Sequence, residues 1–268
     1  MTTSLTPQTL FDLAGRFPGP VIIDVRREAV YADAPDGLPG AIRRTPETVA
    51  EWSRDLEIGR PVVVACVHGH EVGKNACAAL VGQGFAAHYL EGGIEGWREA
   101  GLPMAAKPIP STLWVTRERP KIDRIACPWM IRRFIDRDAR FLYVPAQAVL
   151  QTAEKTGAVP YDIPDVKFSH DGELCSFDAF IKHYALTDPA LLKLAEIVRG
   201  ADTSRLDLTA QSASLFAISL GLSHLFADDH QMLKHGLILY DALYAWVQSL
   251  QTESHNWPPS MPKQEISA

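Results

Sequence analysis

The 268-residue sequence predicts an α/β domain with a doubly wound sheet, followed by a mainly helical α+β domain. In residues 1–105, short apolar runs alternate with helical patterns, which is typical of parallel strands joined by helices. In residues 112–251, long helical patterns surround a few strand-like segments. Residues 106–111 contain two prolines and no periodic pattern, which predicts a linker. The polar, proline-rich residues 252–268 predict a disordered tail.

The composition argues against several classes of protein. A net charge of −6 disfavours broad nucleic-acid binding, and no apolar stretch approaches the length that crosses a membrane. The first seven residues have neither a basic residue nor an apolar core, so they do not resemble a signal peptide. We therefore expect a cytoplasmic protein with no membrane partner. The four cysteines are too widely spaced for a CxxC metal pair and are expected to be free thiols.

Local sequence features predict each helix and strand of the first domain. Thr6 and Pro7 suit the N-cap and first turn of a helix that runs to Phe17. The apolar runs have the length of buried strands and cover residues 21–25, 62–66 and 87–90. The helical patterns between and after them cover residues 46–52, 73–83 and 94–100. A parallel sheet of this kind carries its functional loops at the carboxyl ends of its strands.

Cys66 stands at such a strand end, directly before a short loop and a helix. Backbone N–H groups at a helix start gather around an anion and stabilise it, so this position suits a thiolate or a persulfide. Asp24 and Arg26 follow a second strand and are expected to brace the loop from the same edge of the sheet. The residues expected to surround the substrate are Val67, His68, Gly69, His70, Glu71, Val72 and Gly73.

The first domain resembles the rhodanese family. Four segments carry the resemblance, in the family's order and spacing: Val21-Ile-Ile-Asp-Val-Arg26, Gly37-Leu-Pro-Gly-Ala-Ile42, the Cys66 loop, and Leu90-Glu-Gly-Gly-Ile-Glu-Gly-Trp97. The resemblance implies that Cys66 is a nucleophile that takes sulfur from a donor such as thiosulfate and holds it as a persulfide. It also implies a small-molecule or protein sulfur donor, a thiol or cyanide as acceptor, and no cofactor for the transfer itself.

The loop departs from the family at one position. Rhodanese loops often carry a basic or hydroxyl residue where this chain has Glu71, and a carboxylate there repels an anionic donor. Lys74 compensates in part. This departure favours a protein persulfide or a neutral thiol donor over thiosulfate. Cys77, among alanines on the next helix, is expected to pack in the core.

In the second domain, strands are expected at residues 113–116 and 139–144, with a helix at 122–136 between them. Asp171-Gly172 predicts a type I′ turn in a hairpin over residues 166–177. Four helices are expected to follow, at residues 177–184, 189–200, 209–221 and 228–250. The third of these is nearly all apolar or small and is expected to be a central buried helix.

This domain resembles the C-terminal domain of the ChrB family of chromate resistance proteins. The resemblance rests on residues 117–136, 168–178, 197–203 and 227–246, and it spans about residues 112–250. It implies a link to chromate sensing or resistance, with chromate as a candidate partner. The better-known members carry a different N-terminal region, so a transcriptional role does not follow.

Two kinds of site are considered for this domain. A histidine and carboxylate set at element ends could hold zinc or iron, and its candidate ligands are His170, Asp202, Asp229 and His230. The competing hypothesis is an oxyanion pocket formed by Arg124, Arg132 and Arg133, because guanidinium groups suit a tetrahedral dianion such as chromate. For the arginines, the alternative is a solvated helix face with mixed ion pairs. For the metal set, the alternative is that Asp229 interacts with the dipole of the first turn of a helix.

Two functions therefore stay open. The first is a sulfurtransferase that forms a cysteine persulfide at Cys66, coupled to a ChrB-type domain in chromate or oxidative stress resistance. The second is a non-catalytic protein that senses chromate or a metal, with the rhodanese fold as a redox or docking module.

Overall fold

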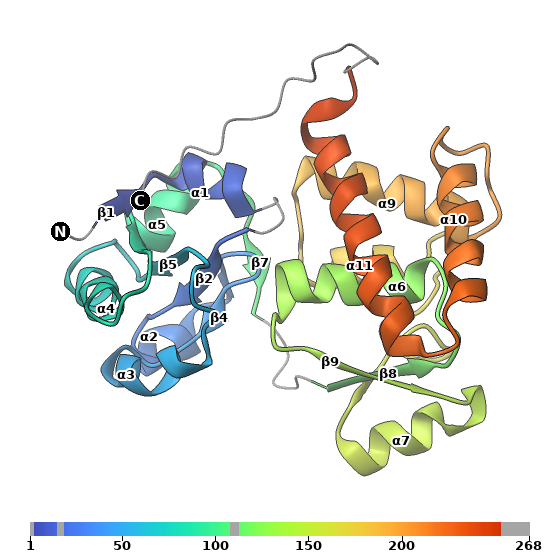
Figure 1. Cartoon of the computed structure of the whole chain (residues 1–268), viewed down its shortest axis with the longest axis horizontal. Helices are drawn as coiled ribbons and strands as arrows, with labels where there is room; N and C mark the ends of the chain where they lie inside the picture. Colours follow the sequence, from blue (N-terminus) through green and yellow to red (C-terminus); the bar gives the residue numbers. More distant parts are fainter. Residues whose placement is uncertain (1–2, 15–18, 108–112, 253–268) are drawn as a thin grey trace.

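The computed structural model describes residues 3–14, 19–107 and 113–252, which form two domains lying side by side (Figure 1). The first domain is built on a five-stranded sheet with the strand order β1-β6-β5-β2-β4, and all neighbouring strands are parallel. The strands are β1 (Thr3–Leu5), β2 (Val21–Asp24), β4 (Ile42–Arg43), β5 (Val62–Ala65) and β6 (Ala87–Leu90). The strand β1 was not predicted from the sequence.

Helices cover both faces of this sheet, as a doubly wound fold requires. Alternate residues of each strand point to opposite faces, so Ile23 and Val64 pack on one side while Ile22 and Val63 pack on the other. The first side is covered by α3 (Val49–Trp52) and α4 (Glu71–Gly82), and the second by α1 (Pro7–Ala14) and α5 (Gly93–Glu99). The predicted α/β class is therefore confirmed for this domain.

Short elements complete the first domain and correct the predicted linker. They are α2 (Glu28–Asp33), the 3₁₀ turns Pro46–Thr48 and Ser53–Asp55, and the antiparallel pair β3 (Asp36–Gly37) and β7 (Ala105–Ala106). Ala106 was expected in the linker but pairs with Asp36, and the Lys107 ammonium donates to the carbonyls of Tyr31 and Ala32. The rest of the predicted linker, and the predicted tail beyond residue 252, lie outside the described residues.

The second domain is rich in helices and contains a three-stranded parallel sheet with the order β10-β8-β9. Its strands are β8 (Leu113–Arg117), β9 (Arg140–Val144) and β10 (Val159–Pro160). Its helices are α6 (Asp123–Met130), α7 (Val149–Thr156), α8 (Ser176–His183), α9 (Pro189–Asp202), α10 (Ser212–Leu225) and α11 (Asp229–Ala245). A π-helical segment, Ile131–Ile135, continues α6, a second, Trp246–Leu250, continues α11, and the 3₁₀ turn Ala146–Ala148 precedes α7. The predicted α+β class with mainly helices is confirmed.

Two local predictions for the second domain are wrong. The hairpin over residues 166–177 does not form, because only Asp171 and Leu174 exchange backbone hydrogen bonds, at 3.1 Å each, before α8 begins. The helix α10 is not central either. Its buried positions are mostly serines, while Ile218 and Leu225 are 47% and 73% exposed.

The domains contact each other through backbone and charged groups. The Gly40 N–H donates to the Phe134 carbonyl at 2.9 Å, and the Arg44 guanidinium lies 3.0 Å from the Asp138 carboxylate. Gly40 has φ +70°, and a Cβ there would lie 2.2 Å from the Arg133 carbonyl oxygen. Only glycine fits this close approach of the two backbones. In the described part of the chain, every helix is too short or too polar to span a lipid bilayer.

Candidate functional site

Cys66 directly follows β5, in the middle of the first sheet. In the register of β2 and β5, Asp24 is paired with Ala65, so Asp24 and Cys66 lie at the same carboxyl edge. The Cys66 residue is 5% exposed, and part of it packs in the core beneath α4. The topology therefore brings the predicted nucleophile and the predicted bracing residues together.

The loop above Cys66 carries a set of unused hydrogen-bond donors. Helix α4 begins at Glu71, two residues earlier than predicted, so the loop consists of residues 67–70 and leads directly into the first helical turn. Within the described residues, none of the seven backbone N–H groups of residues 67–73 donates to an acceptor of the chain. Gly73 lies against the sulfur, because a Cβ at this position would be 3.1 Å from Sγ. Free amides at a helix start beside a sulfur atom form an anion site.

The glycine turn after β6 holds this loop in place. The Ile94 N–H donates to the Cys66 carbonyl at 2.9 Å, and the Glu95 N–H donates to the Val67 carbonyl at 3.0 Å. Gly93 has φ +61°, and its Cβ would lie 2.4 Å from the Cys66 carbonyl oxygen. Gly69 has φ +68°, and its Cβ would lie 2.4 Å from the Leu90 carbonyl oxygen. Both positions therefore require glycine.

The support from Gly93 and Ile94 was not anticipated as part of the site. The sequence signal for this support is the Gly-Gly pair before a helix, which indicates a close backbone approach. These residues fix the carbonyl of Cys66 and leave its sulfur facing α4.

The polar side chains of the loop stand at its rim. His68, His70 and Glu71 are exposed, and the two imidazole rings lie 5.8 Å apart. The Lys74 ammonium lies 5.3 Å from the centre of the Tyr89 ring, so a cation–π contact holds it over β6. Polar groups at the rim can supply a proton or select the charge of a donor without contacting the sulfur.

Asp24 and Arg26 form a buried ion pair with an N–O distance of 2.6 Å. Arg26 also donates to the carbonyl of Asp36 at 3.1 Å and thereby ties the end of β2 to β3. Because their polar atoms are occupied by each other and by the backbone, their geometry suits positioning of the loop rather than contact with substrate. Cys77 lies in the core, where burial raises the pKa of its thiol to about 11.

The second domain contains a compact group of acidic side chains around His170. The carboxylates of Asp123, Asp162 and Asp202 have oxygens 3.3, 3.4 and 3.2 Å from the His170 Nε2 atom. Asp123, Asp162 and His170 each offer one ligand atom within 4.8 Å of the others. Hydrogen bonds to Asp123 and Asp162 raise the pKa of His170 to about 10, so the imidazole carries a positive charge at neutral pH. Three carboxylates thus surround one cationic position.

Two of the four predicted metal ligands do not reach this group. Asp229 instead accepts a hydrogen bond from the backbone N–H of Arg119 at 3.1 Å, and His230 packs edge-on against the Tyr143 ring. Asp123 and Asp162 were missed, because neither stands in a recognisable ligand spacing. Cys127 and Cys175 are fully buried, and burial raises the pKa of both thiols.

In the structure, the three arginines of the predicted oxyanion pocket have different partners. Arg124 pairs with Asp162 at 3.1 Å, and Arg133 pairs with Asp241 at 2.6 Å. Arg132 donates through Nε and Nη2 to the carbonyl of Ala139. Two of the three guanidinium groups therefore already hold a carboxylate, and the trio is not a ready-made chromate pocket.

Comparison with known proteins agrees with both halves of this architecture. Residues 9–100 match the family of the rhodanese-like domain, and residues 114–247 match the family of the ChrB C-terminal domain. The chain belongs to both families. It joins a rhodanese-like domain to a ChrB C-terminal domain in one polypeptide.

Each of the following relatives matches one of the two domains. Thiosulfate sulfurtransferase GlpE of Pseudomonas entomophila is 38% identical over 87 residues, which is 32% of this chain and 77% of that protein. Protein ChrB of Cupriavidus metallidurans is 29% identical over 137 residues, which is 51% of this chain but only 41% of that protein. Among solved structures, a rhodanese-related protein from Thermoplasma volcanium matches 38% of this chain and 96% of its own, with 24% identity and a TM-score of 0.34.

Proposed function

We propose that the rhodanese-like domain transfers sulfur and carries it as a persulfide on Cys66. The observation that supports this most directly is the set of free backbone N–H groups in residues 67–73, at the start of α4 and beside the sulfur. Such donors stabilise the thiolate that attacks and the anionic persulfide that results.

The reaction has two steps. The Cys66 thiolate attacks the terminal sulfur of a donor R–S–SH, so that a new S–S bond forms while the donor's S–S bond breaks and its electron pair leaves as R–S⁻. With thiosulfate as donor, the leaving group is sulfite and the product is an ionised persulfide. An acceptor thiolate or cyanide then attacks the outer sulfur, and Cys66 recovers its thiolate.

The charge of Glu71, at the rim of the loop above Cys66, affects which sulfur donor is favoured. The GlpE relatives are named for thiosulfate, but Glu71 is exposed in the first turn of α4 here. A carboxylate at this point repels a dianion more than a neutral persulfide. We therefore favour a persulfide on a small thiol or on a protein as the donor, with a thiol as the acceptor.

The test is the intact mass of the protein after incubation with thiosulfate or with glutathione persulfide. A gain of one sulfur atom is expected in the wild type and in Cys77→Ala, and no gain is expected in Cys66→Ser. Cyanolysis should release thiocyanate from the same two proteins. A gain of sulfur in Cys66→Ser, or no gain in the wild type with either donor, would overturn the proposal and favour the non-catalytic sensor.

We also propose that the second domain binds zinc or iron through Asp123, Asp162 and His170, with Asp202 within reach. The supporting observation is that ligand atoms of Asp123, Asp162 and His170 lie within 4.8 Å of one another, so a metal ion that displaces the proton of His170 would meet all three. Oxygen and imidazole ligands suit both metals. Metal analysis of the purified chain should find about one ion, which His170→Ala loses and His230→Ala keeps. Equal content in both variants would place the metal elsewhere.

The cellular context that we propose for the two domains is a cytoplasmic role in chromate or oxidative stress resistance.

A further inference from the structure

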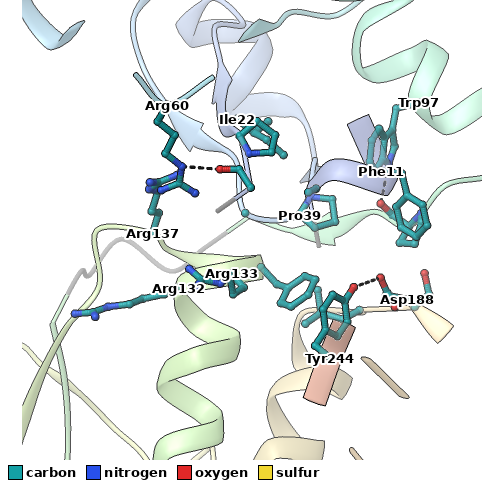
Figure 2. Close-up of a pocket in the computed structure, with 18 residues that line it drawn as sticks. Phe11, Ile22, Pro39, Arg60, Trp97, Arg132, Arg133, Arg137, Asp188 and Tyr244 are labelled. Carbon is teal, nitrogen blue, oxygen red and sulfur yellow. Dashed lines mark hydrogen bonds between the residues drawn. The ribbon is translucent and has the colours of Figure 1, made fainter. Parts of the chain in front are cut away.

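A pocket lies between the two domains, on surfaces that neither proposed site uses (Figure 2). The volume that the centres of water-sized molecules can occupy in it is about 60 Å³, and the pocket opens to solvent. Ile22, Pro39 and Arg60 line it from the first domain. Phe134, Arg137 and Tyr244 line it from the second. Pockets at domain interfaces are common positions for small-molecule ligands.

This pocket is remote from Cys66. Ile22 lies in the first half of β2 and Arg60 precedes β5, whereas Cys66 follows the carboxyl end of β5. A strand of four residues spans roughly 13 Å, so the pocket and the sulfur stand at opposite edges of the sheet. A ligand in the pocket would not occupy the persulfide site.

The arginines that line the pocket have spare donors, and the two carboxylates that act on the charge of Arg137, those of Asp138 and Glu57, lie outside the lining. Within the described residues, Arg60 donates only through Nε, to the Gly19 carbonyl at 2.6 Å, and Arg132 donates to a backbone carbonyl as described above. Arg137 is half-buried, and burial lowers its pKa. For none of these three does the described structure contain an ion pair, and Arg137 makes no hydrogen bond there either.

Asp188 is the one carboxylate among the described residues of the lining, and other groups already hold it. Asp188 caps α9 by accepting from the N–H groups of Ala190 and Leu191 at 2.7 and 2.9 Å. It also accepts from the Tyr244 hydroxyl at 2.6 Å, as Figure 2 shows. The pocket is therefore positively charged at one end, and partly desolvated cations without partners are unfavourable until an anion joins them.

The remaining wall is apolar and aromatic. Phe134 is 9% exposed and Trp97 is 2% exposed, and Ile22 and Pro39 lie beside the arginine end in Figure 2. An inorganic ion could use the guanidinium groups but not this wall. An anionic group attached to an apolar body could use both.

We propose that this interdomain pocket binds a small organic anion, whose charged group contacts Arg60 and Arg137 and whose apolar body lies against Ile22, Pro39 and Phe134. Guanidinium groups bind phosphate, sulfonate and carboxylate through paired hydrogen bonds. Because residues of both domains contribute, the ligand stabilises their contact. This inference does not depend on sulfur transfer at Cys66.

Calorimetric titration of the full chain with phenyl phosphate tests the proposal. Saturable binding is expected, with a higher melting temperature in the presence of the probe, and inorganic phosphate should bind more weakly. Removing a charged hydrogen-bond donor costs about tenfold or more in affinity, so Arg137→Gln should weaken binding by at least that factor. Arg140→Gln changes an exposed arginine of β9 outside the lining and should leave the affinity unchanged.

A second pair of variants keeps the test decisive if Arg137→Gln folds poorly. Thr187 is exposed at the rim of the pocket, so Thr187→Glu adds a repelling charge without disturbing the core, and Thr187→Gln is its uncharged control. Only the former should weaken binding. Cys66→Ser should bind like the wild type. The proposal is overturned if the wild type shows no saturable binding, if the two Thr187 variants bind equally, or if Cys66→Ser abolishes binding.

Discussion

Adding one methyl group at position 73 tests whether the space beside Sγ holds the transferred sulfur. A Cβ on Gly73 would lie 3.1 Å from the Sγ of Cys66 and 3.8 Å from its Cβ. The outer sulfur of a persulfide stands about 2.05 Å from the inner one, so the methyl group and this sulfur compete for one volume. A misplacement of about 1 Å at a reacting centre can cost on the order of 10²-fold. We therefore expect Gly73→Ala to lower the kcat/KM of sulfur loading by about ten- to a hundredfold.

The same substitution should have little effect on stability. Replacing glycine by alanine inside a helix stabilises by about 0.5–1 kcal/mol, and the tight contact with Sγ offsets a similar amount. Gly82 provides the matched control, since it lies on the same helix and a Cβ there meets no atom within 4 Å. Gly82→Ala should keep wild-type activity and raise the melting temperature by about 1–4 °C.

The assay is single-turnover loading followed by intact mass, with thermal unfolding of the same samples. If Gly73→Ala loads sulfur as fast as Gly82→Ala while both remain folded, the transferred sulfur does not lie beside Gly73. The assignment of the free amides to the persulfide would then be wrong, even if Cys66 proved to be the nucleophile.

Three further outcomes are expected. Glu71→Gln should raise kcat/KM for thiosulfate by about three- to tenfold and leave a neutral persulfide donor unchanged, because one exposed charge contributes about 1 kcal/mol; equal changes for both donors would refute this. Burial raises the pKa of Asp136 from 3.8 to about 6, so its contribution favours folding at low pH and is lost as pH rises through about 6. Asp136→Asn should therefore be more stable than the wild type at pH 7 but not at pH 4, as urea unfolding at both pH values would reveal. Gly40→Ala should lower the melting temperature and separate the unfolding of the two domains in calorimetry, since its Cβ meets a backbone oxygen at 2.2 Å; a single unchanged transition would contradict this.

The positions of Asp24 and Cys66 could be predicted from the sequence, because they are set by local pattern and by one topological rule. Asp24 and Cys66 each end an apolar run, and parallel pairing of those runs places both at one edge of the sheet. The start of α4 was less certain, because Glu71 and Val72 read equally well as loop. The free N–H groups that resulted from this earlier start could not be counted from the sequence.

The hairpin failed because a local helix signal was stronger than the turn signal. Gly172 does adopt φ +60°, as the turn prediction required. However, the Asp178 carboxylate accepts from the backbone N–H of Cys175 at 3.0 Å and forms half of a capping box. This cap starts α8 at Ser176, and no residues are left to extend the second strand. The Cys-x-x-Asp spacing that sets this cap is visible in the sequence.

The charged sites of the second domain show where sequence reasoning reaches its limit. Whether an arginine is free to bind a ligand depends on carboxylates far away in the chain, as Arg133 and Asp241 are 108 positions apart. Residues 117–140 contain eight Lys/Arg against four Asp/Glu, and their sequence does not distinguish paired from unpaired arginines. Only the fold shows that Arg133 is paired, and that Arg137, which forms no ion pair in the described chain, lines a pocket shared with the other domain. An anion site of this kind arises from the joining of the two domains, so neither family taken alone predicts it.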